Sequence, residues 1–539
     1  MTARLLLLLV LVVPQAEEIG WSARGKEGAV AAGGAGSVAA GIEILKAGGN
    51  AADAAVATIL ALSVTDHTQF CFGGEVPILV FEAKRGEVEA VSGMGEAPKL
   101  ATREHFEARG GIPARGLEPA AVPATLGACT TTLARYGTMS LEQVVAPTLR
   151  LLDRDPSSWR ADLARTLRRL VDAEKAAAGD RPAKIRAVSE YFYRGPIARE
   201  LEAWMKENGG LIRYEDMAAH ETRIEKPVSV DYRGLQVLKC GPWTQGPYLL
   251  ESLRLLEGFD LKAMGHNSAD TIHVTVEAMK LALSDRDVHY GDPRFVDVPI
   301  DTLLSKAYAD LRRPLIDMKK ASLVQRPGDP RGMKALLGEA QTRKGLGGKP
   351  NDTTTCVVAD RWGNVVAATP SGWSGVVAGA SGIWLGTRLQ SFNTWKGHPN
   401  CIEPGKRPRI TLTPTIVLKG GKPVAAVSVA GGDGQDQVTL QVLLNHFEFG
   451  LAPDAAMTAP RFMTHHFTGS FRQTPPDLGD LRLQSDVSEK VFEDLRARGH
   501  DVSPTRAPVW HPVMVSIDPA TGEKHAAGDP KARRHAAAY

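Results

Sequence analysis

The sequence predicts an α/β (α+β) fold in which two β-sheets pack face to face with helices outside. Two strand-rich blocks follow one another along the chain, and each is accompanied by segments whose apolar residues recur at helical spacing. Between the blocks, residues 326–352 are rich in Gly, Pro and Lys and lack an apolar stripe, which predicts a linker. The 539 residues exceed what one ordinary core holds, so two domains or one large multilayer architecture are expected.

The first block is predicted to begin with helices at 36–47 and 50–62, because Ala, Ile and Leu recur there at helical spacing. Gly48–Gly49 separates them as a helix stop. Residues 76–81 and 87–91 are then expected to form a hairpin over a Lys-Arg-Gly turn. Further helices are predicted at 140–153, 198–208 and 269–284.

The second block is predicted to be richer in strands. Residues 353–359 and 365–369 flank a polar turn, and residues 415–419 and 423–429 flank Gly420–Gly421. Two helices are expected at 438–449 and 488–499, and a last hairpin at 513–518 and 523–527. Together the two blocks supply the strands for two sheets.

Composition and charge exclude several classes of protein. The chain is 43% hydrophobic and 23% charged, which is typical of a soluble globular protein and not of a disordered or fibrous one. Its 64 basic and 61 acidic residues leave a net charge of +3, so we expect no nucleic-acid partner and no anionic membrane surface. The five cysteines are scattered without a C-x-x-C pair, and His465 and His466 are adjacent, so no metal and no cofactor are expected.

The N-terminus resembles an export signal. Arg4 precedes the apolar run 5–13, which is much shorter than the roughly 20 residues that a membrane-spanning helix needs. A secretory signal over residues 1–16 is therefore predicted, with cleavage near Ala16, although Pro14 fits the cleavage rule poorly. No later window is apolar enough to span a bilayer, so the expected protein is periplasmic or secreted.

The junction between linker and second block carries the clearest chemical signal. The linker ends at Asp352, and Thr353 opens an apolar segment. One interpretation is a plain strand start, where Thr is common. The other is self-cleavage before Thr353, which would free an α-amine to serve as the base for that residue's own hydroxyl.

Several motifs, in order, favour the second interpretation, because together they resemble the gamma-glutamyltranspeptidase family of N-terminal-nucleophile hydrolases. The likeness runs from about Gly28 to the C-terminus. The segments that carry it are 48–56, 232–234, 256–260, 277–282, 285–286, 291–293, 352–360, 363–364, 399–408 and 413–417. The resemblance implies a four-layer αββα sandwich of the N-terminal-nucleophile hydrolase type.

The resemblance also implies roles for particular residues. Thr353 matches the nucleophile and autoprocessing residue, with a register uncertainty over Thr354 and Thr355. Ser371 matches the family's second Thr and keeps its hydroxyl. Gly431 and Gly432 match the pair whose backbone amides form the oxyanion hole, where a lost donor costs about 2.7–4 kcal/mol. The alternative for these glycines is a plain turn at a strand end.

The residues that recognise the glutamyl group depart from the family. Met94 stands where the family places an Arg for the substrate α-carboxylate, and Ser391 where it places an acid for the α-amine. A thioether cannot replace a bidentate guanidinium–carboxylate pair. The other changed positions are Arg388, Trp373 and Thr411. Thr411 and the preceding Ile410 stand where the family has two adjacent serines. Arg388 adds a cation that would suit an acyl group with its own carboxylate.

The sequence therefore predicts an exported, self-processing amidohydrolase and acyltransferase with a large subunit, 17–352, and a small subunit, 353–539, that associate as a heterodimer. Its expected partner is a small-molecule amide or peptide substrate. The family default is hydrolysis and transpeptidation of glutathione and other γ-glutamyl amides. The alternatives are an acylase-like hydrolase of non-glutamyl amides, of dicarboxylic monoamide, oxamate or glutaryl type, and a processed but inactive binding protein.

Overall fold

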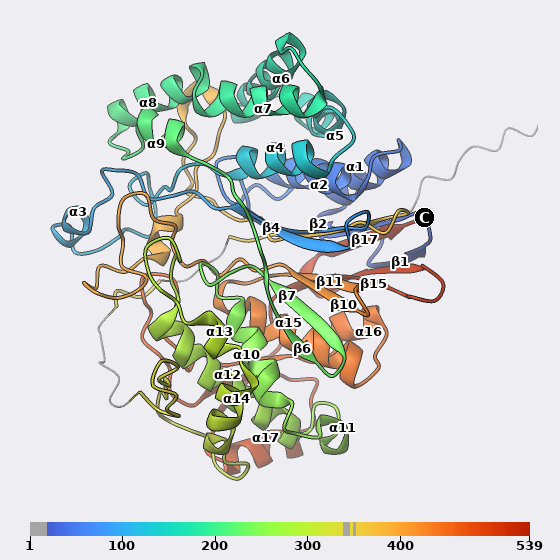
Figure 1. The fold of residues 1–539 in the computed structure, drawn as a ribbon, viewed down its shortest axis with the longest axis vertical. Helices are drawn as coiled ribbons and strands as arrows, with labels where there is room; N and C mark the ends of the chain where they lie inside the picture. The colour runs from blue at the N-terminus through green and yellow to red at the C-terminus, as the bar shows by residue number, and fades with distance from the viewer. Residues whose placement is uncertain (1–18, 338–344, 349–351) are drawn as a thin grey trace, which may run out of the picture.

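The computed structural model describes residues 19–337, 345–348 and 352–539. Helices lie on both outer sides of two central sheets, which gives four layers in the order αββα (Figure 1). The predicted fold class is confirmed. The export signal at residues 1–16 lies outside the described residues, as do parts of the predicted linker.

The first sheet has seven strands, and every neighbouring pair is antiparallel. Its central part joins segments from both halves of the chain, because β8 lies between β2 and β9, and β9 pairs with β3. In sheet order the strands are β17 (Arg534–Ala538), β2 (Gly28–Gly33), β8 (Cys356–Asp360), β9 (Val365–Ala368), β3 (Val76–Glu82), β4 (Glu87–Gly93) and β5 (Ile224–Glu225).

The second sheet also has seven antiparallel strands drawn from both halves of the chain. In sheet order they are β1 (Ser22–Gly25), β16 (Lys524–Gly528), β15 (His511–Ile517), β11 (Lys422–Ala430), β10 (Thr415–Lys419), β7 (Leu235–Lys239) and β6 (Val228–Tyr232). A small third sheet contains β12 (Phe462–Met463), β13 (Asp480–Gln484) and β14 (Asp501–Thr505). A cut before residue 353 would therefore leave two chains held together by interleaved strands.

Helices from the first half of the chain lie on the outer side of the first sheet, some against its strands and the others packed on those helices. They are α1 (Ala35–Lys46), α2 (Ala51–Thr65), α4 (Thr125–Tyr136), α5 (Leu141–Arg154), α6 (Trp159–Ala176), α7 (Arg181–Tyr193), α8 (Pro196–Asn208) and α9 (Tyr214–Ala219), while α3 (Arg103–Glu107) lies at the side (Figure 1). At the N-terminus of α2, Asn50 accepts the backbone N–H of Asp53, and the Asp53 carboxylate accepts the backbone N–H of Asn50. This reciprocal cap fixes the start of the predicted second helix.

The second sheet is covered by helices from both halves of the chain. They are α10 (Pro247–Leu256), α11 (Leu261–Met264), α12 (Ala269–His289), α13 (Ile300–Leu303), α14 (Lys306–Arg312), α15 (Gln435–Leu443), α16 (Pro453–Thr458) and α17 (Glu489–Ala497). The predicted helix 438–449 differs, because α15 continues as a π-helical turn over Leu444–Glu448. In the described part of the chain, none of the helices is long and apolar enough to cross a membrane.

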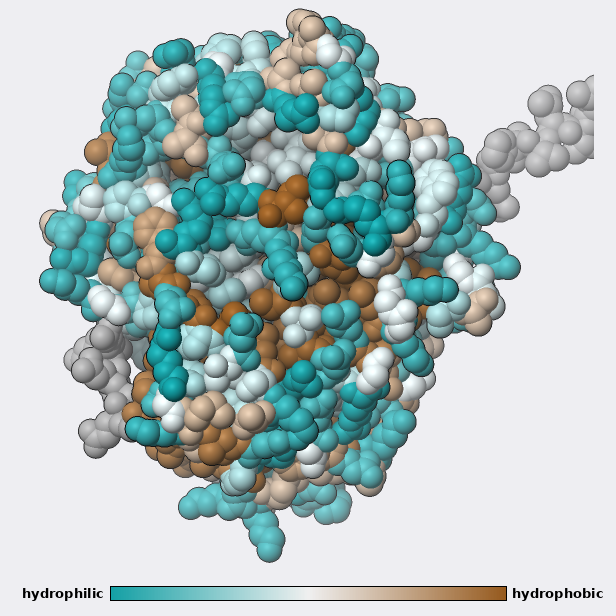
Figure 2. All heavy atoms as spheres, in the orientation of Figure 1, coloured by the Kyte–Doolittle hydropathy of each residue, from teal (hydrophilic) through white to brown (hydrophobic). Residues whose placement is uncertain are grey.

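Three apolar clusters hold the layers together. One lies under the helices of the first sheet, one under those of the second, and one between the two sheets. In Figure 2, apolar side chains gather across the middle of the molecule, at the level where the sheets lie in Figure 1. All five cysteines are buried and unpaired, in line with the prediction that most of them are small core residues.

Candidate active site

Thr353 lies three residues before the first residue of the central strand β8. The predicted strand 353–359 is wrong by three residues at its start, since β8 begins at Cys356. The two threonines that follow Thr353 are instead held by single backbone hydrogen bonds: the N–H of Thr354 donates to the Pro370 carbonyl at 2.8 Å, and the N–H of Gly33, at the end of β2, donates to the Thr355 carbonyl at 3.1 Å. Thr353 is therefore fixed in a buried position at the edge of the sheet core.

Two hydroxyl groups converge on the peptide bond that precedes Thr353. The Oγ1 of Thr353 lies 2.5 Å from the carbonyl oxygen of Asp352 and 3.2 Å from Ser371 Oγ. Ser371 also donates to this carbonyl oxygen. Ser371 itself is fixed by Glu75, because their backbone N–H and C=O groups bond reciprocally at 3.0 Å. The structure thus brings Thr353 and Ser371 together at one carbonyl.

A buried ion pair supports Ser371. The Nε of Arg388 contacts Glu75 Oε1 at 2.5 Å, and both side chains are at most 2% exposed. Arg388 Nη2 donates to Ser371 Oγ at 2.5 Å and lies 3.7 Å from the Asp352 carboxylate. Burial lowers the pKa of Arg388, but Glu75 and Asp352 outweigh it, so the net pKa is raised and the guanidinium stays charged. Arg388 is therefore a cation shared between two carboxylates beside the hydroxyl of Ser371.

The Glu75 carboxyl gives the site a pH dependence. Burial raises its pKa from 4.5 to about 7, with Arg388 opposing the rise and Asp352 adding to it. The folded protein therefore holds a proton that the unfolded chain releases between these values. The resulting stability is fully present below pH 4.5 and is lost as the pH rises through 7.

Replacing Glu75 by glutamine should abolish this dependence. Relative to E75Q, the protein with Glu75 should lose up to about 3 kcal/mol of unfolding free energy between pH 4.5 and 8, at about 1.4 kcal/mol per pKa unit. Urea unfolding at several pH values measures the difference, with both proteins in a Thr353→Ala background so that a single chain is compared. Parallel pH curves would contradict the raised pKa of Glu75.

Four of the five predicted substrate-binding residues carry a buried polar atom without a hydrogen-bond partner among the described residues. These atoms are Arg388 Nη1, Trp373 Nε1, Ser391 Oγ and Thr411 Oγ1. Buried polar groups are usually satisfied, so unpaired groups at a site invite a ligand or water. The fifth residue, Met94, is 1% exposed and lies in the apolar cluster between the two sheets.

Gly431 and Gly432 follow the end of β11, and both have positive φ angles, of 145° and 54°. A β-carbon on Gly431 would lie 2.3 Å from the ring of Trp510, so glycine is required there on two grounds. The next residue, Asp433, is fixed by the buried guanidinium of Arg286 at 2.7 Å. Near this end of β11, Ser428 Oγ donates to the carbonyl of Ala368 in β9. The glycine pair is thus a rigid turn on the sheet that faces β9.

Sequence reasoning missed Glu75 and Trp510. Glu75 lies 313 residues from Arg388, and no local pattern links the two. Trp510 adopts a φ of 57°, which is unusual for a bulky residue, and it covers the glycine turn. The only sequence signal for Glu75 was a charged residue placed directly after Gly73–Gly74 and before an apolar strand.

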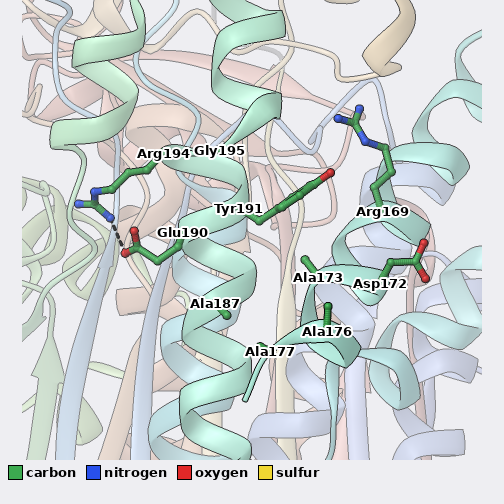
Figure 3. A pocket seen from close by; sticks show the side chains of 10 residues that line it. All are labelled: Arg169, Asp172, Ala173, Ala176, Ala177, Ala187, Glu190, Tyr191, Arg194 and Gly195. Carbon is green, nitrogen blue, oxygen red and sulfur yellow. Dashed lines mark hydrogen bonds and ion pairs between the residues drawn. The ribbon is translucent and has the colours of Figure 1, made fainter. Parts of the chain in front are cut away.

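Other polar clusters and hollows lie apart from these residues. A hollow of about 670 Å³ is lined by Tyr191, Arg194 and other residues of 169–195, and no predicted site residue lines it. Figure 3 shows the side chains that line this hollow. His465 contacts Asp480 at 2.7 Å, while His466 accepts the Gly479 N–H, so the adjacent histidines have separate partners. Among the described residues, no cluster of His, Cys, Asp and Glu could hold a metal ion.

Two face-to-face sheets with helices on both outer sides form the αββα architecture of an N-terminal-nucleophile hydrolase. The family model for gamma-glutamyltranspeptidase matches residues 37–154 and 157–539. The chain belongs to this family. A glutathione hydrolase proenzyme of Escherichia coli (strain K12) is 33% identical to it, over 96% of this chain and 92% of that protein.

Acylases are also among the relatives. The acylase ACY 1 proenzyme of Pseudomonas sp. (strain SE83) is 30% identical, over 86% of this chain and 85% of that protein. The crystal structure of cephalosporin acylase from Bacillus halodurans superimposes with a TM-score of 0.80 at 28% identity, covering 99% of both chains. The chain is accordingly an enzyme similar to glutathione hydrolases, within a family that includes acylases.

Proposed function

We propose that this protein is an exported, self-processing amidohydrolase and acyltransferase whose nucleophile is the hydroxyl of Thr353. The observation that carries the proposal is the convergence of the Thr353 and Ser371 hydroxyls on the carbonyl oxygen of Asp352, in a buried site. Relatives named proenzymes support processing of the precursor into chains 17–352 and 353–539. The interleaved strands of both sheets would hold the two chains together as a heterodimer.

In the processing step, Ser371 donates to the Asp352 carbonyl and stabilises negative charge on its oxygen as Thr353 Oγ1 attacks the carbonyl carbon. Arg388 donates to Ser371 Oγ, so the Ser371 hydroxyl is oriented with its proton toward the carbonyl. Arg388 acts through Ser371 here and is a positioning residue for this step. Hydrolysis of the resulting ester frees the α-amine of Thr353.

In the mature enzyme, that α-amine accepts the proton of the Thr353 hydroxyl, which then attacks the carbonyl carbon of an amide substrate. The backbone amides of Gly431 and Gly432 are proposed to hold the oxyanion, because glycine lets the backbone approach it closely. The amine product leaves with the proton, and water or a second amine takes the acyl group from Thr353.

The acyl group is proposed to be of a non-glutamyl, acylase-like type, with γ-glutamyl transfer as the competing assignment from the family. Two observations favour the former. Met94 is buried among apolar side chains and offers no charge to an α-carboxylate. Ser391 is fully buried with an unpaired hydroxyl among the described residues, so it offers no anion to an α-ammonium group.

Amine release from a panel of acyl anilides tests the proposed function. Purified wild-type protein should hydrolyse at least one of the γ-glutamyl, glutaryl, succinyl or oxamyl anilides, and Thr353→Ala should hydrolyse none, because it has neither nucleophile nor freed amine. A matched Thr132→Ala variant removes a buried hydroxyl on α4 and controls for the loss of a Thr hydroxyl from the core. Equal rates for Thr353→Ala and wild type would refute the nucleophile. Wild-type protein that is cleaved but inert toward the whole panel would favour a binding protein.

A further inference from the structure

The side chain of Asp352 occupies the same buried site as the two hydroxyl groups. Its carboxylate is about 10% exposed, accepts the backbone N–H of Trp373 at 3.1 Å and lies 3.7 Å from Arg388 Nη2. Burial raises the pKa of this carboxyl, while Arg388 and the Trp373 amide oppose the rise. A carboxylate taken out of water needs such partners. The fold therefore contains a site for the carboxylate of Asp352, the residue whose carbonyl group forms the bond proposed to be cut.

Self-cleavage would turn Asp352 into an acyl group on Thr353. Attack by Thr353 Oγ1 forms a C–O bond to the Asp352 carbonyl carbon, the C–N bond breaks, and the hydroxyl proton passes to the nitrogen. Water then adds its hydroxyl to this carbon and returns a proton to the Thr353 oxygen. The intermediate ester has the connectivity of the acyl-enzyme that an amide substrate would form. The Asp352 side chain thus extends in the direction available to a substrate's acyl group.

Arg388 would remain charged and incompletely paired once the aspartyl end leaves. Before cleavage it faces the carboxylates of Glu75 and Asp352, and afterwards only that of Glu75. Its Nη1 already has no hydrogen-bond partner among the described residues, although the side chain is only 1% exposed. A buried guanidinium with a free N–H and a vacated neighbouring position favours a second carboxylate.

We propose that Asp352 occupies, before cleavage, the subsite that later receives the acyl carboxylate of the substrate, and that this substrate is a monoamide of a four-carbon dicarboxylic acid. The inference rests on the proposed function and names its substrate class. In an aspartyl residue, two carbons separate the carbonyl carbon from the carboxylate carbon, which is the spacing of a succinyl group. The Trp373 amide and Arg388 would hold that carboxylate.

The test compares kcat/KM of the processed wild-type enzyme for four anilides with the same leaving group: succinyl, glutaryl, succinamoyl and butanoyl. Succinamoyl is the neutral isostere of succinyl. We expect kcat/KM for the succinyl anilide to exceed that for the succinamoyl and butanoyl anilides by at least about tenfold, because the two neutral acyl groups lose a charge-assisted hydrogen bond. The kcat/KM for the succinyl anilide should also exceed that for the glutaryl anilide. Equal rates for succinyl and succinamoyl would overturn the proposal.

Processing supplies a second readout that does not depend on a chosen substrate. Asp352→Asn and Asp352→Ala should lengthen the half-time of self-cleavage at least about tenfold, and Asp352→Glu should fall between them and wild type. The rates of self-cleavage with Asp, Glu and Asn at position 352 would then decrease in the same order as kcat/KM for the succinyl, glutaryl and succinamoyl anilides. Self-cleavage of Asp352→Ala at the wild-type rate would show that the carboxylate does not seat the acyl group, and would overturn the proposal.

Failure of this inference differs from failure of the proposed function. If the enzyme is processed and hydrolyses neutral or γ-glutamyl anilides through Thr353 without preferring succinyl, the subsite assignment falls and the amidohydrolase stands. If the protein is neither cleaved nor active on any anilide, the proposed function itself falls, and the subsite assignment falls with it.

Discussion

Replacing Thr353 by alanine should leave the purified protein as a single chain, whereas wild-type protein should separate into two bands on a denaturing gel. The variant lacks the hydroxyl that lies 2.5 Å from the Asp352 carbonyl oxygen. Without it no ester can form, so cleavage should be abolished and not merely slowed. Amide hydrolysis should fall by at least about 10³-fold, as when a nucleophile is removed.

Two companion variants make this result specific. Thr353→Ser keeps a hydroxyl and should still be cleaved. Thr354→Ala removes a buried hydroxyl one residue later, one that has no hydrogen-bond partner among the described residues, and it should be cleaved at the same bond as wild type. Two bands from Thr353→Ala, or one band from Thr354→Ala, would move the nucleophile to another threonine.

The second large effect concerns γ-glutamyl substrates. Met94 and Ser391 supply neither the cation nor the anion that would bind the α-carboxylate and α-ammonium groups of a glutamyl head. Each charge-assisted hydrogen bond contributes about 1.5–3 kcal/mol. Two such losses, if additive, lower kcat/KM for glutathione by about 10²- to 10⁴-fold relative to an enzyme with both anchors.

A matched pair of substrates isolates the ammonium contribution. γ-Glutamyl and glutaryl anilides share their leaving group and chain length and differ only in the α-amino group. We expect the glutaryl compound to have the higher kcat/KM by tenfold or more, because the Ser391 hydroxyl supplies no negative charge to pair with the ammonium. If the γ-glutamyl compound is preferred by tenfold, the family default holds and the interpretation of Ser391 is wrong.

Local sequence signals predicted the elements whose partners are close in the chain. The hairpin of β3 and β4 pairs residues across a short turn, so alternation and turn chemistry were sufficient. Strand β2, with the sequence Gly-Ala-Val-Ala-Ala-Gly, is wholly buried but has few residues of high β-propensity, and it was not predicted. Its partner β17 lies at the other end of the chain, and sequence spacing carries no information about that pairing.

In the candidate site too, local sequence motifs identified some residues, whereas contacts between residues distant in the chain were not predicted. Thr353 and Ser371 were identified by motifs, and the fold brings them to 3.2 Å because β8 and β9 are adjacent strands. Arg388 was predicted as a substrate-binding residue, and its pairing with Glu75, from the loop before β3, was not predicted. A buried ion pair between residues far apart in sequence depends on tertiary packing, which no periodicity or local motif encodes.

The intact mass of the purified wild-type protein tests the central claim most directly. We expect two chains, the smaller with the mass of residues 353–539 and an N-terminal Thr353, with both masses together exceeding the mass of the precursor by one water. Thr353→Ala should give only the precursor mass. A wild-type protein that keeps the full precursor mass and still hydrolyses amides would contradict the claim that Thr353 becomes the nucleophile by cleaving its own chain.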